Sequence, residues 1–285
     1  MALATSKELV VHAQRNGYAV PAINVQGANY DNIRAICEAA EENGSPMIIA
    51  SYVETLHYHG MEWFAQVSKY LADKVKVPVA IHLDHGNTFE ICMKAIRSGF
   101  TSVMLDGSAE LIQDNIKHTN EVINAARAVG VSVEAEVGEL ARLDAQGNQG
   151  KNKNLASVKD VKEFLSGCEP DLLAVGIGNA HGFYNGKPDI RLDILKEIRA
   201  ITDIPLVLHG ATGIPVEDVK EAIDIGITKI NFGTLVRYKL MEYYKEGIET
   251  LDHKGHIWKV SMYAEEKLKG DIKDIIMLSR SNNRY

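Results

Sequence analysis

The chain has 285 residues, of which 46% are hydrophobic and 24% are charged, and its formal net charge is −7 at pH 7. These proportions are close to those of an average globular protein, and one large domain fills this length. A negative net charge provides no basic surface for nucleic acid, and no stretch approaches the roughly 20 uninterrupted apolar residues of a membrane helix. We therefore expect a protein that binds neither nucleic acid nor membranes.

Two features predict a cytoplasmic location. The first 20 residues carry charges within their apolar pattern and lack the core of a signal peptide. The three cysteines, Cys37, Cys92 and Cys168, are scattered and odd in number, which suits reduced thiols in the core of a cytosolic protein.

Short apolar runs rich in β-branched residues alternate with amphipathic helical patterns, which is typical of βα units. The first pattern is a helix over 5–16, where Thr5 and Glu8 have capping-box spacing and Gly17 follows as a stop. Helical stripes at a 3.6-residue spacing separate the later runs. Eight strands are predicted, over 18–25, 47–50, 79–83, 102–105, 131–137, 172–177, 206–208 and 229–232.

This pattern predicts an α/β fold, a (β/α)8 TIM barrel with extra C-terminal helices, as one domain over 1–285. An open doubly wound sheet is the alternative, but no G-x-G-x-x-G follows the first strand. The segment 235–285 exceeds one barrel unit. We expect this helical extension to pack outside the barrel, help an oligomer to form, or close over the site.

Polar side chains lie within or just after six consecutive predicted strands. In barrels of this kind, chemistry gathers at the C-terminal ends of the strands. A purely structural pattern has little reason to place such residues there six times, so this rim is the candidate site. The residues are His82, Asp84 and His85 at strand three, Asp106 at strand four, Glu134 and Glu136 at strand five, Asn179 and His181 at strand six, His209 at strand seven, and Asn231 at strand eight.

Three of the ten histidines, His85, His181 and His209, lie just beyond strands three, six and seven. Three neutral imidazoles that converge leave a fourth position open, which is the arrangement of a catalytic zinc site. A single histidine at a rim is more often not a metal ligand, but three histidines together favour a metal site. Hydrolytic metal barrels typically carry His-x-His at the first strand, where this chain has only Asn24.

The acidic residues have competing interpretations. Asp84, next to His85, can move a proton to or from a substrate hydroxyl, or can merely orient an imidazole. His82 is interpreted as a buried, hydrogen-bonded histidine. Asp106 and Glu136 either cap the following helices or offer oxygen ligands for a second or displaced metal. Glu134 shares a strand face with Glu136, so that one is a ligand and the other its support.

Glycine-rich segments follow the seventh and eighth strands, at 210–213 and 233–234. Turns need glycine for ordinary reasons. However, barrels frequently bind phosphate in these two loops through backbone N–H groups. The two segments therefore predict a phosphate site.

With these residues in place, the chain resembles the class II, metal-dependent ketose-bisphosphate aldolases, which include fructose- and tagatose-bisphosphate enzymes. The resemblance covers nearly the whole chain, in long blocks that occur in order. The blocks are YAVPAIN (18–24), AIHLDHG (80–86), VSVEAE (131–136), AHGFY (180–184) and VLHGATGIP (207–215).

The resemblance implies a Zn²⁺ ion bound by His85, His181 and His209, with Asp84 as the proton donor and acceptor at the C4 hydroxyl. Asp106 and Glu136 correspond to second-metal ligands of the family. A monovalent cation, Na⁺ or K⁺, near the phosphate and a homodimer or homotetramer are also implied. The residues that match the dihydroxyacetone-phosphate half and the triose are Asn24, Ser51, Gly182, Gly210, Ala211, Thr212, Asn231, Phe232, Gly233 and Thr234.

The chain departs from the family after strand five. The family usually has a glycine-rich loop and then acidic residues that move a second proton, whereas segment 138–147 lacks that acidic cluster. Glu139 and Asp144 are the candidate substitutes. Near the C-terminus, Arg284 resembles the end of tagatose-bisphosphate enzymes and is a candidate clamp for a distal phosphate, or belongs to a frayed tail.

The leading hypothesis is a zinc-dependent aldolase that cleaves a ketose 1-phosphate or 1,6-bisphosphate to dihydroxyacetone phosphate and an aldehyde. One alternative is a metal-dependent hydrolase on the same barrel. Another is a sugar-phosphate-binding or assembly subunit that has lost catalysis through the altered loop.

Overall fold

The computed structural model describes residues 3–25, 29–142, 155–251 and 256–285. Eight parallel strands close into a barrel in the order β1-β10-β9-β7-β5-β4-β3-β2. All eight predicted strands and the TIM-barrel fold are confirmed, and the open doubly wound alternative is wrong. The strands are β1 Val20–Asn24, β2 Met47–Tyr52, β3 Val79–Gly86, β4 Ser102–Leu105, β5 Ser132–Val137, β7 Leu172–Val175, β9 Leu206–Leu208 and β10 Ile227–Phe232.

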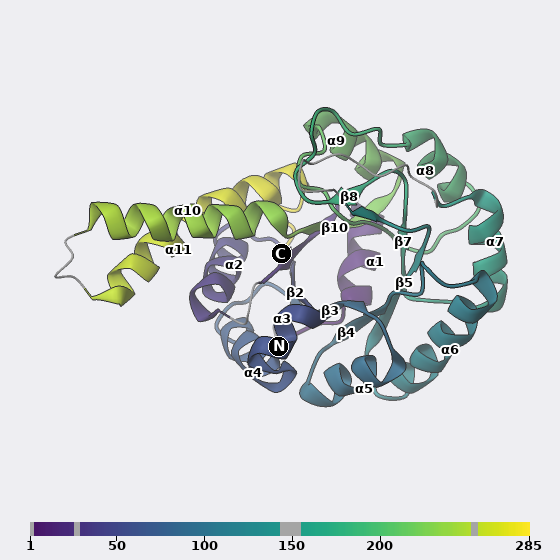
Figure 1. The fold of residues 1–285 in the computed structure, drawn as a ribbon, viewed down its shortest axis with the longest axis horizontal. Coiled ribbons are helices and arrows are strands. Elements are labelled where there is room, and N and C mark those ends of the chain that lie inside the picture. The colour runs from purple at the N-terminus through teal and green to yellow at the C-terminus, as the bar shows by residue number, and fades with distance from the viewer. Residues whose placement is uncertain (1–2, 26–28, 143–154, 252–255) are drawn as a thin grey trace.

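Helices surround this barrel (Figure 1). They are α2 Tyr30–Glu42, α3 Val53–His59, α4 Met61–Ala72, α5 Phe89–Ser98, α6 Ile112–Ala128, α7 Val158–Gly167, α8 Leu192–Arg199 and α9 Val216–Ile225. The predicted stripe of α2, including Ile33 and Ile36, is buried in the core between helices and barrel. Sequence patterns did not predict α3 or the short parallel pair of β6 Ala141–Arg142 and β8 Ala180–His181.

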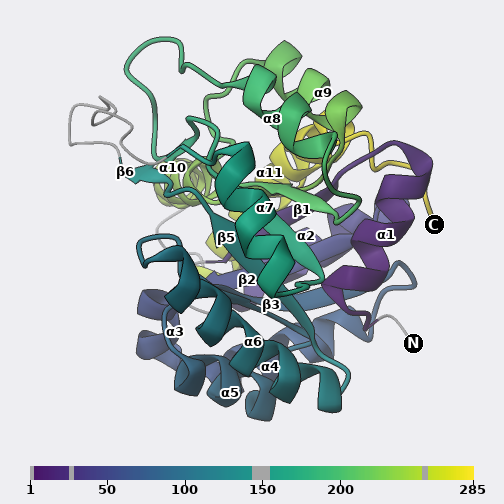
Figure 2. The ribbon, with the colours of Figure 1, turned by 90° about the vertical axis from the view of Figure 1, so that its right-hand side faces the viewer.

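Helix α1, Ser6–Asn16, closes one end of the barrel (Figure 2). Its predicted capping box is confirmed, because the Glu8 N–H donates to the Thr5 hydroxyl at 3.2 Å and the Thr5 N–H donates to the Glu8 carboxylate at 2.7 Å. Leu9, Val10 and Ala13 of its apolar face pack against the apolar residues inside the barrel. The helix therefore seals the N-terminal end, and the opposite rim is left for chemistry.

The C-terminal helices α10, Thr234–Thr250, and α11, Ile257–Leu278, pair with each other and project from the side of the barrel (Figure 1). Helix α11 also lies along α2, where Arg34 and the buried Glu265 form an ion pair of 2.7 Å. The extension thus packs outside the barrel. Among the described residues, no helix combines the length and the apolar character required to cross a membrane.

The chain end returns to the N-terminal end of the barrel (Figure 2). The Asn283 and Arg284 N–H groups donate to the carbonyls of Asn43 and Gly44, both at 2.8 Å, and the Arg284 guanidinium lies 4.8 Å from the centre of the Tyr18 ring. Asn43 and Gly44 precede β2, and Tyr18 precedes β1. Arg284 therefore lies at the end of the barrel opposite the rim. The structure therefore contradicts both a distal-phosphate clamp on the rim of the same chain and a frayed tail.

Candidate metal centre

Three strands each bring two polar side chains into the barrel. The pairs are two residues apart: His82 and Asp84 on β3, Glu134 and Glu136 on β5, and Lys229 and Asn231 on β10, all at most 2% exposed. Residues i and i+2 share a strand face, so each strand contributes to two successive layers of the interior. The layer nearer the rim contains Asp84, Glu136 and Asn231, and the layer below contains His82, Glu134 and Lys229.

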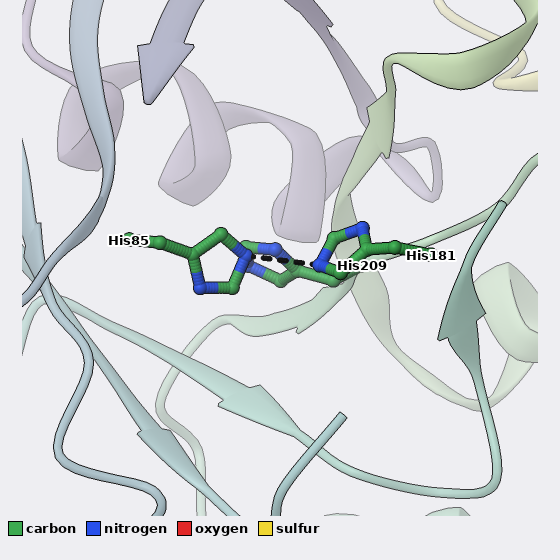
Figure 3. Close-up of side chains that lie close together, drawn as sticks. All are labelled: His85, His181 and His209. Atoms are coloured by element: carbon green, nitrogen blue, oxygen red, sulfur yellow. Dashed lines mark hydrogen bonds between the residues drawn. The ribbon is translucent and has the colours of Figure 1, made fainter. Parts of the chain in front are cut away.

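The three predicted histidines converge on one point (Figure 3). The Nε2 atoms of His85 and His181 are 3.2 Å apart, and the three residues offer ligand atoms that all lie within 4.8 Å of one another. Two nitrogens bound at about 2.05 Å to one tetrahedral zinc ion lie about 3.3 Å apart. The arrangement can therefore hold a metal ion.

The backbone at the end of β3 turns His85 toward this point. The β3–β4 register shifts between Leu83 and Gly86, and His85 has φ +48°, a left-handed conformation that costs a non-glycine residue energy. Such strain is typical of functional positions. The bulge lets the adjacent Asp84 and His85 both reach the site.

Carboxylates fix two of the imidazoles. The Nδ1–H of His85 donates to Asp106 at 2.7 Å, so its Nε2 faces His181. The Nε2–H of His209 donates to Glu134 at 2.7 Å, so its Nδ1 faces Asp84 at 3.8 Å. A hydrogen bond of this kind sets the tautomer and ring orientation of a metal-binding histidine.

Asp84 is held by two amides. Asn24 and Asn231 donate through Nδ2 to its two oxygens at 2.7 and 2.9 Å. Burial acts to raise the pKa of Asp84, but the neighbouring His85 and His209 outweigh it and lower the pKa below its ordinary value. Asp84 is thus an oriented, ionised carboxylate beside the histidines, and it can accept a proton.

His85, Asp106 and Glu136 form a second group with metal-ligand spacing. Neither oxygen of the buried Glu136 has a hydrogen-bond partner among the described residues. Burial and the charge of Asp106 raise the pKa of Glu136 well above its ordinary value. For His85, burial opposes the charged form, but Asp84, Asp106 and Glu136 together raise its pKa to about 10.

This cluster of acidic groups stabilises positive charge at the rim, and a buried carboxylate without a hydrogen-bond partner is rare unless a cation completes it. Imidazole nitrogens together with carboxylate oxygens are ligands that suit zinc. The residues present therefore fit a divalent metal ion.

The predicted phosphate loops lie beside one another at the start of α10. Gly210 has φ +63°, and a Cβ there would lie 2.3 Å from the Ala180 carbonyl oxygen, so only glycine fits. The Ala211 N–H donates to the Asn231 carbonyl at 3.3 Å, and the Thr212 hydroxyl accepts from the Leu235 N–H at 3.2 Å. The other predicted phosphate-site residues lie after β8 or where β10 passes into α10. They are Gly182, Phe232, Gly233 and Thr234.

Other predicted residues have different surroundings. Ser51 is buried, and its hydroxyl hydrogen-bonds to Thr55 at 2.7 Å. The interpretation of His82 is confirmed, since it is fully buried and bonds to the Ser102 hydroxyl at 2.8 Å. Glu139 is exposed, and Asp144 lies outside the described residues.

Lys229 is the main residue that the sequence patterns missed. It is fully buried, and its ammonium donates to Glu134 at 2.7 Å. The alternation of β10 contained the signal, because Lys229 lies two residues before Asn231 and so shares its inward face.

Comparisons with known proteins agree with this geometry. The family profile described as fructose-bisphosphate aldolase class-II matches residues 4–284. The chain is 39% identical to the fructose-bisphosphate aldolase of Mycoplasma pneumoniae over 260 residues, or 88% of this chain and 87% of that one. It is 40% identical to the 6-phospho-5-dehydro-2-deoxy-D-gluconate aldolase of Bacillus velezensis over 237 residues, or 82% and 80% of the two chains.

The fold is also similar to that of the YdjI aldolase from Escherichia coli K12. The TM-score is 0.86 at 30% identity, with 99% of each chain covered. The chain is therefore a class II aldolase, a lyase acting on sugar phosphates, and belongs to the class II fructose-bisphosphate aldolase family.

Proposed function

We propose that the chain is a zinc-dependent aldolase that reversibly cleaves a ketose 1-phosphate or 1,6-bisphosphate to dihydroxyacetone phosphate and an aldehyde. His85, His181 and His209 would hold the ion. The observation that carries this proposal is the convergence of these three imidazoles beside an ionised carboxylate, Asp84, that two asparagines orient.

When bound, the zinc ion supplies a Lewis acid that draws electron density from the ketone oxygen of the substrate. Asp84 takes the proton of the C4 hydroxyl during cleavage of the C3–C4 bond, and returns it to the aldehyde oxygen during condensation. The electron pair of that bond stays on the dihydroxyacetone-phosphate half, which gains at C3 a proton that exchanges with solvent. Asn24 and Asn231 keep its oxygens aligned for both directions. Asp106 and Glu136 offer ligands for a second or displaced metal position, together with His85.

The dihydroxyacetone-phosphate half would lie against the loops after β8, β9 and β10. The 17-residue helix α10 begins there, and the N-terminus of a helix binds phosphate groups favourably. A monovalent cation, Na⁺ or K⁺, beside this phosphate is part of the proposal. The residues proposed to contact this half are Asn24, Ser51, Gly182, Gly210, Ala211, Thr212, Asn231, Phe232, Gly233 and Thr234.

Removal of the metal is expected to abolish condensation of dihydroxyacetone phosphate with an aldehyde, and added Zn²⁺ is expected to restore it. The reason is that the ion stabilises the negative charge that develops at the ketone oxygen. Metal analysis before and after chelation, coupled to a screen of aldehydes with this common donor, tests the prediction. Activity that survives complete metal removal would reject the proposal.

The aldehyde half decides which ketose is cleaved. The fructose-bisphosphate aldolase of Geobacillus stearothermophilus and the B. velezensis enzyme both match at 40% identity, so overall similarity does not separate their substrates. Arg237, an exposed cation in the first turn of α10, is the candidate ligand for a phosphate on the aldehyde. It lies over the Tyr238 ring, which packs edge-on against Phe183 in the loop after β8.

Replacement of Arg237 by alanine is expected to raise KM for a bisphosphate substrate about tenfold to a hundredfold, which is the contribution of one hydrogen-bonded charge pair. The kcat and the KM for dihydroxyacetone phosphate should change little. Steady-state kinetics with paired mono- and bisphosphate ketoses provides the measurement. Lys245→Ala, farther along α10, is the matched control, and an equal effect from both variants would argue against a specific contact.

The two alternative functions predict different results. A metal-dependent hydrolase would cleave esters or amides and would not exchange the C3 proton of dihydroxyacetone phosphate with solvent. A binding or assembly subunit would take up phosphate and zinc, yet the loss of Asp84 would change no rate. The pairing of Asp84 with two asparagines supports the catalytic proposal, because a binding subunit does not need an aligned base.

We also propose that the protein forms a homodimer or homotetramer in the cytoplasm. The projecting pair of α10 and α11 supports an oligomer, because Met241, Ile248, Trp258 and Met262 are each at least half exposed there. Large exposed apolar side chains that gather on one element are typical of protein interfaces.

A further inference from the structure

The lower polar layer of the barrel contains an ion pair for which the aldolase chemistry has no direct use. Lys229, Glu134 and His82 are all 0% exposed. The Lys229 ammonium donates to Oε2 of Glu134 at 2.7 Å and lies 3.5 Å from Nε2 of His82. His82 is held from its other side by Ser102 at 2.8 Å.

Burial of these charges is costly. The apolar residues buried inside the barrel include Ala22, Ile48, Ala80 and Val207. Apolar residues of similar volume often replace a buried ion pair without loss of stability. Packing alone therefore does not explain a lysine at this position.

The second oxygen of Glu134 supplies the explanation. Oε1 accepts from Nε2–H of His209 at 2.7 Å, while Oε2 accepts from Lys229. The carboxylate thus bridges the lysine on β10 and the imidazole of His209, just after β9. Held at both ends, it cannot rotate away from the histidine ring.

We propose that Lys229 is a positioning residue of the metal centre, which holds the Glu134 carboxylate so that His209 presents Nδ1 to the ion. This inference rests on the proposed zinc site. Lys229 touches neither the ion nor the substrate and acts only through Glu134 and His209. Loss of such an outer partner typically weakens metal binding about tenfold to a hundredfold.

The test measures metal affinity rather than turnover. Zinc dissociation constants of the wild-type protein and Lys229→Met are determined by competition with a chromophoric chelator. The absorption spectrum of bound Co²⁺ reports the ligand geometry. We expect the zinc dissociation constant of Lys229→Met to rise about tenfold to a hundredfold, with an altered Co²⁺ spectrum.

A double-mutant cycle with Glu134→Gln separates positioning from packing. The introduced glutamine amide still accepts from His209 but turns its NH₂ group toward the Lys229 ammonium, so Glu134→Gln alone should weaken zinc binding. In Lys229→Met/Glu134→Gln that NH₂ group can donate to His82 Nε2, and the buried charges are gone. We expect the double variant to bind zinc no more weakly than Glu134→Gln, because without the carboxylate Lys229 has nothing to hold.

The Arg34–Glu265 pair between α2 and α11 provides the matched control, since Glu265 is also buried and the pair is also 2.7 Å long. Arg34→Met is expected to lower Tm and leave the zinc dissociation constant unchanged. A wild-type zinc constant in Lys229→Met would overturn the inference and leave the proposed function intact. Where Lys229→Met does not fold, the comparison of the other two variants decides. A zinc affinity at least tenfold weaker in the double variant than in Glu134→Gln would overturn the inference. A wild-type protein that takes up no zinc would instead reject the proposed function.

Discussion

The exchange of Asp84 for asparagine is expected to lower kcat for ketose cleavage about a thousandfold, which is within the range for loss of a general base. This corresponds to about 4 kcal/mol of transition-state stabilisation. The amide has the shape of the carboxylate, and the two asparagines that contact Asp84 can reorient to meet it. It cannot take up the C4 hydroxyl proton. The fold and zinc content should therefore remain, and steady-state cleavage rates beside metal analysis provide the measurement.

Exchange of the C3 proton of dihydroxyacetone phosphate distinguishes the role of Asp84 from general damage to the site. That exchange does not involve the C4 hydroxyl, so it should fall far less than cleavage in Asp84→Asn. Asp224→Asn, at a surface carboxylate paired with Arg280, is the control and should change neither rate. Equal losses of exchange and cleavage in Asp84→Asn would indicate that the substitution disturbs the metal rather than proton transfer.

The strands and most helices follow from local patterns. The stripe of α2, the capping box of α1 and the apolar runs of the barrel depend only on neighbouring residues, and each is where the sequence predicts it. The convergence of His85, His181 and His209 also followed, because closure of a parallel barrel brings all the strand ends to one rim.

Features that depend on contacts between distant parts of the chain could not be predicted from local sequence patterns. The return of the chain end to the floor of the barrel rests on backbone bonds from Asn283 and Arg284 to Asn43 and Gly44, across about 240 residues, and no local pattern encodes them. The bulge that re-aims His85 is set by pairing with β4. Similarly, Asp106 had two equal interpretations until the structure placed its carboxylate against His85.

The buried lysine shows a different limit. Alternation along β10 places Lys229 on the inward face, but hydropathy opposes a charge there, and only its partner on β5 resolves the conflict. Pairing of β10 with β9, and of β9 with β7 beside β5, fixes which carboxylate it meets. The convergence of the three histidines depends on topology and could be predicted, whereas the layer beneath depends on specific side-chain pairs and could not.

Loss of one zinc ligand should have the second large effect, and His181→Ala is the most informative choice. Zinc binding by a complete set of four ligands is worth about 10–16 kcal/mol, so one imidazole contributes about 3 kcal/mol, or a factor of about a hundred to a thousand in affinity. His181 is half-buried on the short β8, whereas His209 is fully buried and bonded to Glu134. Removal of the His181 imidazole should therefore abolish aldol activity at ordinary zinc concentrations with little change in Tm.

His209→Ala should lose zinc equally but also lower Tm, because it empties a buried position and leaves Glu134 without its imidazole partner. Metal content by mass spectrometry and thermal denaturation in the absence of zinc separate the two variants. Added imidazole should restore part of the activity of His181→Ala at high zinc, since the vacated site is reachable from solvent. Full zinc occupancy in His181→Ala would show that the ion does not depend on this imidazole, and the three-histidine centre would have to be abandoned.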